Sequence, residues 1–244
     1  MSAFGGPNII TDGLVLNLDA GNSKSYPGSG TTWFDISGYK STGILTNGPT
    51  FNSSSLGSLV FDGINDYVNF GGSQASLVRS ATSLSIGATF FCTGFSNIQS
   101  GYGWAPLSVI DRYSLGNDRR KFTFQADIEN GVEKISAFFF NGSGVLVQIN
   151  FATPVLNKLF FAVVTVDSTS SKIYVNGNLV SQSSGIVVNP NPQEAELYVA
   201  GRVNTPYNGY FKGNLYQMQF YNRALTPQEV LQNYNATKGR FGLV

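Results

Sequence analysis

The sequence predicts an all-β protein: a two-sheet antiparallel sandwich with one short C-terminal helix. Nearly every apolar segment alternates with a period of two or forms a short run of β-branched and aromatic residues, which is typical of strands. Clusters of Gly, Asn, Ser and Pro separate these segments and indicate tight turns. A chain of 244 residues suits one large β domain, because sandwiches often reach this length undivided. We therefore expect a single domain over residues 1–244.

Thirteen segments have the composition of strands. They lie at 14–19, 58–62, 67–70, 84–92, 107–112, 121–128, 134–140, 145–151, 159–167, 172–176, 179–182, 196–201 and 213–222. The stretch 20–57 is instead rich in Gly, Ser, Asn and Pro, so it is expected to be mostly loop. Within it, Trp33 is the expected anchor that fastens this loop to the sandwich.

Two tight turns follow from asparagine–glycine pairs. A two-residue type I′ turn needs a positive φ at both central positions, and Asn-Gly meets this requirement best. The pair Asn176-Gly177 in "IYVNGNLV" therefore predicts a hairpin. The pair Asn130-Gly131 in "DIENGVEK" predicts a second hairpin end.

One helix is marked by its capping residues. In "ALTPQEVLQNYNATKG", Thr226 is the expected N-cap, Pro227 suits the first helical position and Glu229 completes a capping box. The helix is expected to end by Lys238-Gly239. The side chains expected to lie against the sandwich are Val230, Leu231 and Tyr234.

The composition excludes several kinds of site and partner. The chain has no histidine, which excludes Ser-His-Asp and Cys-His catalysis and His-ligated zinc. Its 15 basic and 14 acidic residues leave a net charge of +1, so we expect no nucleic-acid partner and no anionic membrane surface. The longest strongly apolar run, 159–166, is far shorter than the roughly 18 residues of a membrane span.

The N-terminus and the single cysteine predict where the chain folds. "MSAFGGPNII" lacks a basic segment followed by an apolar one, so no secretory signal is expected. Cys92 lies in an apolar strand pattern and is expected to be a buried small hydrophobe. We therefore expect a chain that folds in a reducing cytoplasm, or is assembled there before release.

Four segments occur in the order found in one family. They are "GSLVFDGINDYVNF", "SLSIGATFF", "LFFAVVTVDSTSSKIYVNGNLVSQ" and "GYFKGNLYQMQFYNRALTPQEVLQNY". They resemble the laminin-G-like domains of the concanavalin A-like lectin/glucanase superfamily over residues 58–236, with "YVNG" and "YNRALTPQEV" as the more specific pair. Ahead of them, residues 1–57 hold an N-terminal strand and a long loop, and their stretch "GPNIITDGLVLNLDAGNSKSYPGSGTTWFDISG" resembles the leader of bacteriophage proteins of this group, many of them marine or cyanobacterial. The resemblance implies a jelly-roll sandwich but no single activity, because this fold hosts lectins, hydrolases and structural modules.

The enzymes among the proteins that this chain resembles are glycoside hydrolases, which carry acidic residues on one strand in the pattern E-x-D-x-E. Their chemistry needs two carboxylates on one face, one as acid and the other as nucleophile or base. The chain has no such triplet, and its nearest approaches are Glu194 with Glu196 and Asp127 with Glu129. The first pair follows "NPNPQ" and is expected in a loop, and the second is expected at a hairpin end. We therefore expect no catalytic residues and no enzyme activity.

Asp62, Asn65 and Asp66 in "FDGINDYVNF" admit two interpretations. Calcium would need about six to eight oxygen ligands, so the fold would have to bring Asp19 or Asp167 near them. Asp and Asn also close tight turns by accepting hydrogen bonds from backbone amides. We expect a turn between two strand ends, with a calcium site as the alternative, and we expect no other cofactor.

Two glycine-containing segments place aromatic rings beside polar residues. "SNIQSGYGWAP" holds Tyr102 and Trp104, and "NTPYNGYF" holds Tyr207 and Tyr210. Both segments are expected to be loops with partly exposed rings. Such rings fit a glycan site, a protein–protein contact or simple loop packing, and the sequence leaves these alternatives open.

The resemblance and the composition together suggest two functions. The first is a non-catalytic bacteriophage virion protein, such as a capsid decoration or tail-appendage component. It would be assembled into a virion in the host cytoplasm, contact other virion proteins and form a homo-oligomer there. The alternative is a glycan-binding, lectin-like adhesin module that recognises host surface polysaccharide.

Overall fold

The computed structural model describes residues 7–54, 56–72, 81–99, 101–111, 122–140, 146–184, 196–203 and 208–243. Within these ranges the chain forms two large antiparallel sheets, a two-stranded sheet and one long helix. The predicted all-β sandwich with a C-terminal helix is therefore confirmed. No helix in the described ranges is long and apolar enough to cross a membrane.

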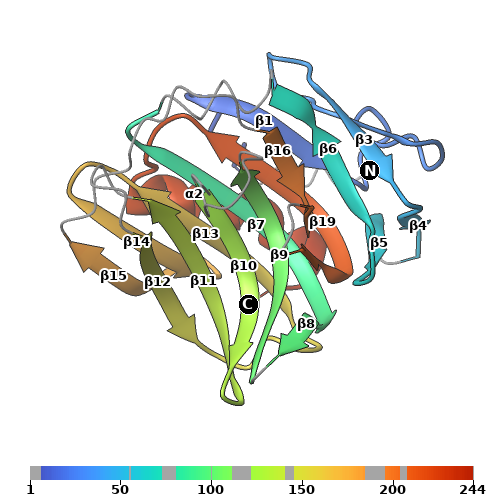
Figure 1. Cartoon of the computed structure of the whole chain (residues 1–244). Coiled ribbons are helices and arrows are strands. Elements are labelled where there is room, and N and C mark those ends of the chain that lie inside the picture. The colour runs from blue at the N-terminus through green and yellow to red at the C-terminus, as the bar shows by residue number, and fades with distance from the viewer. Residues whose placement is uncertain are drawn as a thin grey trace.

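Sheet A holds eight strands among the described residues. They are β1 Leu14–Asp19, β4 Thr50–Asn52, β5 Ser58–Asp62, β7 Leu84–Gly94, β13 Leu159–Val166, β14 Ser170–Val175, β15 Asn178–Ser184 and β19 Lys212–Tyr221. The strand order is β15-β14-β13-β7-β19-β5-β4, and β1 also pairs with β19. Some neighbours in this order are consecutive in the sequence, such as β13 and β14, whereas others lie far apart in it, as Figure 1 shows for β7 and β19.

Sheet B holds nine strands among the described residues. They are β2 Thr32–Phe34, β3 Thr42–Thr46, β6 Tyr67–Phe70, β8 Ser96–Gln99, β9 Tyr102–Asp111, β10 Phe122–Glu129, β11 Val132–Phe140, β12 Leu146–Ala152 and β16 Glu196–Val199. The order is β12-β11-β10-β9-β16-β6-β3-β2, with β8 paired to β9. The small sheet joins β17 Gly201–Arg202 to β18 Gly209–Tyr210.

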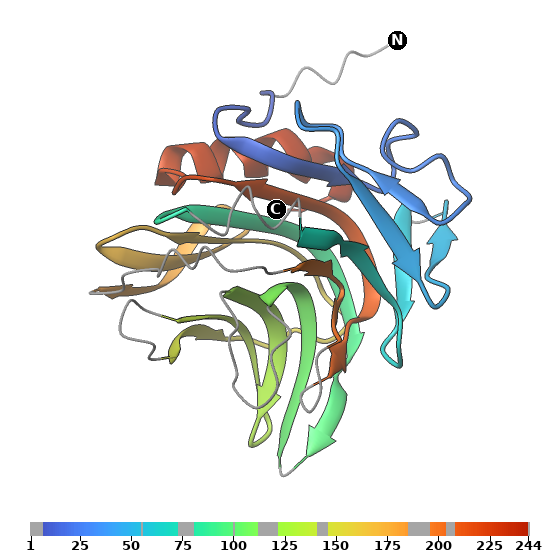
Figure 2. The ribbon, with the colours of Figure 1, turned by 45° about the horizontal axis from the view of Figure 1, so that its top comes forward.

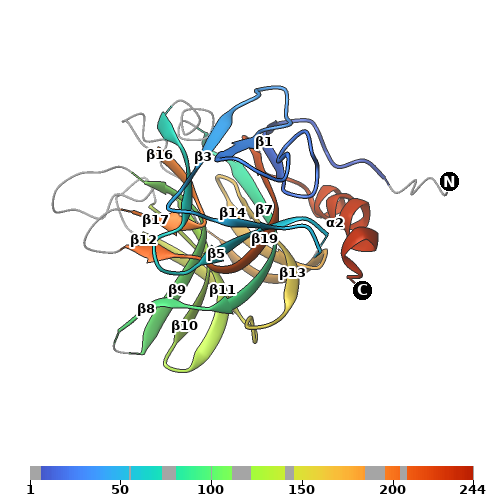
Figure 3. The same cartoon turned by 90° about the vertical axis from the view of Figure 1, so that its right-hand side faces the viewer.

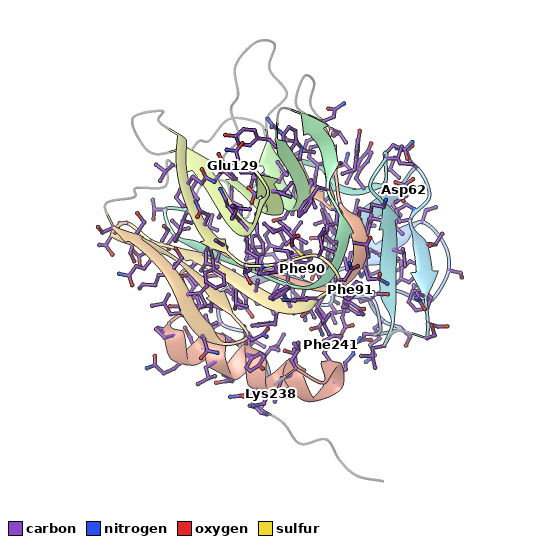
Figure 4. All side chains as sticks on the ribbon, turned by 90° about the horizontal axis from the view of Figure 1, so that it is seen from below. Asp62, Phe90, Phe91, Glu129, Lys238 and Phe241 are labelled. Carbon is purple, nitrogen blue, oxygen red and sulfur yellow. The ribbon has the colours of Figure 1, made fainter. Side chains whose placement is uncertain are left out.

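The main hydrophobic core lies between sheets A and B. Phe90 of β7 and Phe124 of β10 are fully buried in it, and the Phe90 ring stacks on Phe160 with centroids 5.9 Å apart. Figure 4 shows Phe90 between the two layers of ribbon. Side chains alternate along a strand. The inward residues of β10, which are Phe122, Phe124 and Ala126, therefore leave its polar residues on the outward face.

The segment 20–57 contains three short strands that the sequence pattern missed, β2, β3 and β4. Trp33 is completely buried in the main core, as expected of an anchor. The carboxylate of Asp35 fixes the same segment by accepting hydrogen bonds from the amides of Asn17, Ser37 and Ser41 at 2.8, 2.7 and 3.1 Å. This polar clamp ties a glycine-rich segment to β1, so the segment has a defined path despite its composition.

The helix α2, Pro227–Phe241, lies on the outer face of sheet A. Figure 2 shows the layers in the order helix, sheet A, sheet B. The predicted N-cap and capping box are confirmed at Thr226 and Glu229. Of the predicted apolar face, Val230 and Tyr234 are buried but Leu231 is 46% exposed.

The helix continues two residues past its expected end at Lys238-Gly239, to Phe241, and so completes its last turn. Phe241 closes this turn by packing its ring edge-on against Tyr216, with centroids 5.3 Å apart. Gly242 then ends the helix in the left-handed conformation, with φ 63°. Packing of an aromatic ring beyond a glycine is a tertiary effect, so the local sequence did not indicate it.

Replacing Thr226 with alanine is expected to lower the free energy of unfolding by about 1 kcal/mol. The substitution removes the hydroxyl that accepts a hydrogen bond from the amide of Glu229. Equilibrium unfolding in urea measures the loss. The control is Thr226→Ser, which keeps the hydroxyl and should leave stability nearly unchanged. An alanine variant as stable as the serine variant would contradict this account of the helix start.

Candidate functional site

The outward face of sheet B carries polar and aromatic side chains in rows that cross the strands. Three of these rows are centred on β10. They are Val109–Thr123–Phe138–Gln148, Pro106–Gln125–Ser136–Asn150 and Trp104–Asp127–Lys134–Ala152. Directly opposed residues in antiparallel strands lie on one face of the sheet, so each row brings four strands to a common surface.

A pocket of about 370 Å³ opens on this face. The described residues that line it are Tyr102, Gly103, Trp104, Pro106, Gln125, Asp127, Ile128, Glu129, Phe138, Gln148 and Arg202. They come from β9, β10, β11, β12 and β17. Figure 3 shows β17 and β8 on the side of the molecule away from α2. The pocket therefore has a polar floor and an aromatic wall.

Asp127 is the most deeply placed acid of this pocket, with only 8% of its surface exposed. Its Oδ1 accepts a hydrogen bond from the Ser136 hydroxyl at 3.0 Å, and its Oδ2 accepts one from Nε2 of Gln125 at 3.1 Å. Burial raises the pKa of Asp127 above its ordinary value. The two hydrogen bonds from neutral donors stabilise the buried carboxylate, because burial of a charge without such partners is unfavourable.

Glu129 lies two residues further along β10, at the rim of the pocket. Its carboxylate pairs with the Lys134 ammonium and accepts a hydrogen bond from the Tyr102 hydroxyl. The bond from Lys134 and the bond from Tyr102 lower the pKa of Glu129. The two acids therefore differ: Glu129 is held ionised by donors, while Asp127 binds a proton more readily than an ordinary aspartate.

Trp104 forms a wall of the pocket and packs against the backbone of β18. A Cβ at Gly209 would lie 2.0 Å from Nε1 of Trp104, so only glycine fits there with the ring in this place. The Ser96 hydroxyl ties the same parts together, because it donates to the Trp104 carbonyl at 2.8 Å and accepts from the Tyr210 amide at 2.9 Å. The indole N–H of Trp104 is buried without a protein partner.

The structure brings two of the four predicted contact residues into the pocket. Tyr102, which is 45% exposed, and Trp104 both line it. Tyr210 lies on β18, where its amide is fixed by Ser96, and Tyr207 lies outside the described residues. The expectation that the first segment is a loop is wrong, because β8 and β9 form a hairpin there with Gly101 at φ 84°. Two glycines in a polar segment concealed this strand pairing.

The side chains of Asp62 and Asp66 act inside their own turn. Oδ1 of Asp62 accepts hydrogen bonds from the amides of Ile64 and Asn65 at 2.7 and 3.3 Å. Oδ2 of Asp66 accepts one from the amide of Asp62 at 3.1 Å. The turn joins β5 to β6, and Figure 4 shows Asp62 well apart from Glu129. These contacts are those expected of carboxylates that close a turn.

Asp19 and Asp167 have other contacts. Oδ2 of Asp19 pairs with Arg240 at 2.7 Å and accepts a hydrogen bond from Gln217 at 2.9 Å. Oδ1 of Asp167 accepts hydrogen bonds from the amides of Thr169 and Ser170. Among the described residues, no three acidic or cysteine side chains gather in a way that could hold a metal ion.

The alternative of a calcium site at Asp62, Asn65 and Asp66 has a simple test. We expect calcium to leave the melting temperature unchanged, because oxygens of Asp62 and Asp66 already accept backbone amides. Thermal unfolding with and without calcium measures this. A calcium-dependent rise that Asp66→Ala removes, and that Asp12→Ala keeps, would instead identify a calcium site.

Asp127 and Glu129 lie on one strand and on one face of it. The sequence predicts these two residues at a hairpin end. The hairpin turn at Asn130-Gly131 is present, with φ 50° and 81°, but β10 extends through Glu129. Of the other acidic pair, Glu194 lies outside the described residues. Glu196 begins β16 and accepts a hydrogen bond from the Tyr198 hydroxyl.

Sequence reasoning missed three residues that line the pocket, Gln125, Gln148 and Arg202. It also missed Lys134 and Ser136, which contact the two acids of the pocket. Part of the signal was present, because Gln125, Asp127 and Glu129 alternate with apolar residues in "FTFQADIE". That alternation alone predicts a polar face on this strand. The contribution of Arg202 depends on how β17 folds back on β9, and no local pattern encodes that contact.

Comparisons with known proteins agree with this architecture. A laminin-G-type sequence profile, described as the concanavalin A-like lectin/glucanases superfamily, matches residues 62–231. No curated protein matches the chain in sequence. Solved structures of low identity share the fold alone.

A Trypanosoma rangeli sialidase in complex with 2,3-difluorosialic acid is similar at a TM-score of 0.65 and 16% identity, covering 96% of this chain and 35% of the sialidase. The binding domain of botulinum neurotoxin serotype G is similar at a TM-score of 0.62 and 17% identity, covering 91% of this chain and 50% of that one. The chain thus spans about a third to a half of these proteins.

Proposed function

Because the chain belongs to the concanavalin A-like lectin/glucanase superfamily, we propose that it binds carbohydrate in the pocket on the outward face of sheet B. The observation that carries the proposal is the row of Trp104 and Asp127 across β9 and β10, with Gln125 beside it. A sugar has an apolar C–H face that packs on an aromatic ring and hydroxyls that need hydrogen-bond partners. The pocket offers both within one concave surface.

We further propose that the site is not catalytic. Both acids are engaged, Glu129 by Lys134 and Tyr102 and Asp127 by Gln125 and Ser136. Glycoside hydrolysis needs a protonated carboxyl and an ionised carboxylate that both act on the scissile bond, and here the ionised carboxylate, Glu129, is neutralised by the Lys134 ammonium. The assay is release of reducing ends from a polysaccharide panel, and we expect none. Release that Asp127→Asn abolishes would overturn this part of the proposal.

A glycan array with the purified chain tests the binding function. We expect saturable retention of at least one polysaccharide class, confirmed in solution by calorimetry. The chain should bind the retained glycan with one site per domain. An array that retains nothing above background would overturn the proposal, because the polar floor and aromatic wall would then have no ligand to explain them.

We also propose the virion role as a second candidate, because two exposed apolar side chains favour a protein contact. Phe34 of β2 is 42% exposed and Ile44 of β3 is 47% exposed, and the strand register makes them diagonal neighbours on the outward face. Burial of such a pair against another virion protein would be favourable. Copurification of the chain with particles, lost in a double variant with serine at both positions, would support this role. Particles that lack the chain would overturn it.

A further inference from the structure

We propose that Asp127 determines which saccharides the pocket accepts, by fixing the Gln125 amide so that its oxygen remains for the ligand. The site would then select neutral saccharides that donate hydroxyl hydrogen bonds, and reject saccharides that carry carboxylates. The inference rests on the proposed carbohydrate-binding function and adds the chemical class of the ligand.

The orientation of Gln125 follows from its contact with Asp127. A carboxylate only accepts hydrogen bonds, so the Gln125 atom 3.1 Å from Oδ2 of Asp127 is the donor, Nε2. The oxygen Oε1 is then the group that Gln125 has left to offer. The Ser136 hydroxyl donates to the other oxygen of Asp127, which fixes the carboxylate from its second side. In the floor of the pocket, Ser136 and Gln125 therefore both donate hydrogen bonds to Asp127, and this leaves the oxygen of Gln125 as an acceptor for the ligand.

The charges around the pocket add to this selection. The described charged and titratable groups that face Asp127 are Tyr102 from β9, Glu129 from β10, Lys134 from β11 and Arg202 from β17. The ammonium of Lys134 is paired with Glu129, and Arg202 is 8% exposed and not free. β12 contributes Gln148, which is neutral. A carboxylate on an incoming saccharide would therefore face the acceptor oxygens of Gln125 and Asp127. The nearby cations, Lys134 and Arg202, already have partners.

Acceptors that face a ligand discriminate strongly between hydroxyls and carboxylates. A saccharide hydroxyl donates to Oε1 of Gln125 and to the free lone pairs of Asp127. A carboxylate at the same place offers no proton, and it brings a like charge beside a buried one. Leaving buried polar groups unpaired is what makes such sites reject the wrong ligand.

Matched polymers test the selection. The probes are a neutral glucan and the glucuronan made from it by oxidising its C6 hydroxymethyl groups, together with the same pair made from a galactan and a mannan. We expect at least one neutral polymer to bind roughly 10-fold or more tightly than its oxidised form. Equal binding, or tighter binding of the oxidised form, would overturn this inference and leave the carbohydrate-binding function standing. Binding of no polymer would overturn both.

Asp127→Asn reverses the polarity of the floor without changing its shape. Asn keeps an oxygen for Ser136, but its Nδ2 needs an acceptor, so the Gln125 amide turns over and presents Nε2 to the ligand. We expect binding of the neutral polymer to weaken by about 10-fold and its preference over the oxidised polymer to shrink by about as much. The control is Asp12→Asn on the opposite side of the molecule, whose carboxylate is 85% exposed and which should change neither value. Unchanged selectivity in Asp127→Asn would contradict the proposal.

The pH profile separates this role from a merely structural one. Burial raises the pKa of Asp127, so the carboxylate becomes protonated at a higher pH than an ordinary aspartate. Wild-type binding should be full above this raised pKa and weaken as the pH falls through it, while Asp127→Asn shows no such loss. Because the pKa of Asp127 is higher in the folded state than in the unfolded state, the contribution of Asp127 to stability falls as the pH rises through this pKa. The variant at neutral pH should therefore not melt earlier than the wild type, whereas a structural residue would lose stability.

Discussion

Replacement of Trp104 with alanine is expected to weaken the binding of a retained saccharide by about 30-fold, because a buried aromatic anchor of an interface contributes roughly 2 kcal/mol or more. The ring is the aromatic wall of the pocket and stands in the same row as Asp127. Calorimetry with the glycan found on the array measures the change. Loss of the ring removes the apolar surface on which a sugar would pack.

Two further variants test whether the position of the ring matters. Gly209→Ala places a methyl 2.0 Å from Nε1 of Trp104, so the ring must move and binding should weaken although the indole is still present. Phe34→Ala, which removes an exposed ring on β2 outside the residues that line the pocket, is the control and should bind normally. Full affinity in Trp104→Ala would show that the saccharide binds elsewhere.

Replacement of Trp33 with alanine is expected to destabilise the fold by about 3–5 kcal/mol, the range for large buried aromatic residues cut to alanine. Trp33 is 0% exposed and packs in the main core. Its partner across β2 and β3 is Gly43, where a Cβ would lie 2.4 Å from the Phe70 ring. The space around Trp33 is therefore shared with a second ring, and alanine would leave a cavity. Equilibrium unfolding in urea measures the loss.

Trp33→Phe is the matched control for this prediction. Phenylalanine keeps most of the buried ring and removes an indole N–H that has no partner, so it should cost much less than alanine. A loss below about 1 kcal/mol in Trp33→Ala would contradict the role of Trp33 as the anchor of segment 20–57. Because the chain has two tryptophans, the pair also separates stability from binding: Trp33 affects the first and Trp104 the second.

Local patterns predicted most of the fold. The strands at 14–19, 58–62 and 67–70 were predicted to the residue, because each is a short alternating run between glycine or asparagine turns. The type I′ turn at Asn176-Gly177 is confirmed by φ angles of 49° and 80°. The capping box fixed the start of α2 but not its end, where the packing of Phe241 decided the last turn.

The pocket was less predictable because it depends on which strands become neighbours. The alternation in "FTFQADIE" places Gln125, Asp127 and Glu129 on one face, and this was available from the sequence. The register that sets Trp104 opposite Asp127 was not available, since the pairing of β9 with β10 shifts between Phe124 and Gln125 and no local pattern indicates this shift. Tyr102 and Trp104 were predicted as contact residues from composition alone, and their strand placement came from the structure.

Tryptophan fluorescence of the Trp33→Phe variant tests the central claim most directly. In that variant Trp104 is the remaining tryptophan, so its emission reports on the pocket. The carbohydrate-binding account predicts a saturable change in emission as the retained saccharide is added, with the same dissociation constant that calorimetry gives. Binding seen by calorimetry with no change in Trp104 emission would contradict the account, because the saccharide would then lie outside the pocket on sheet B.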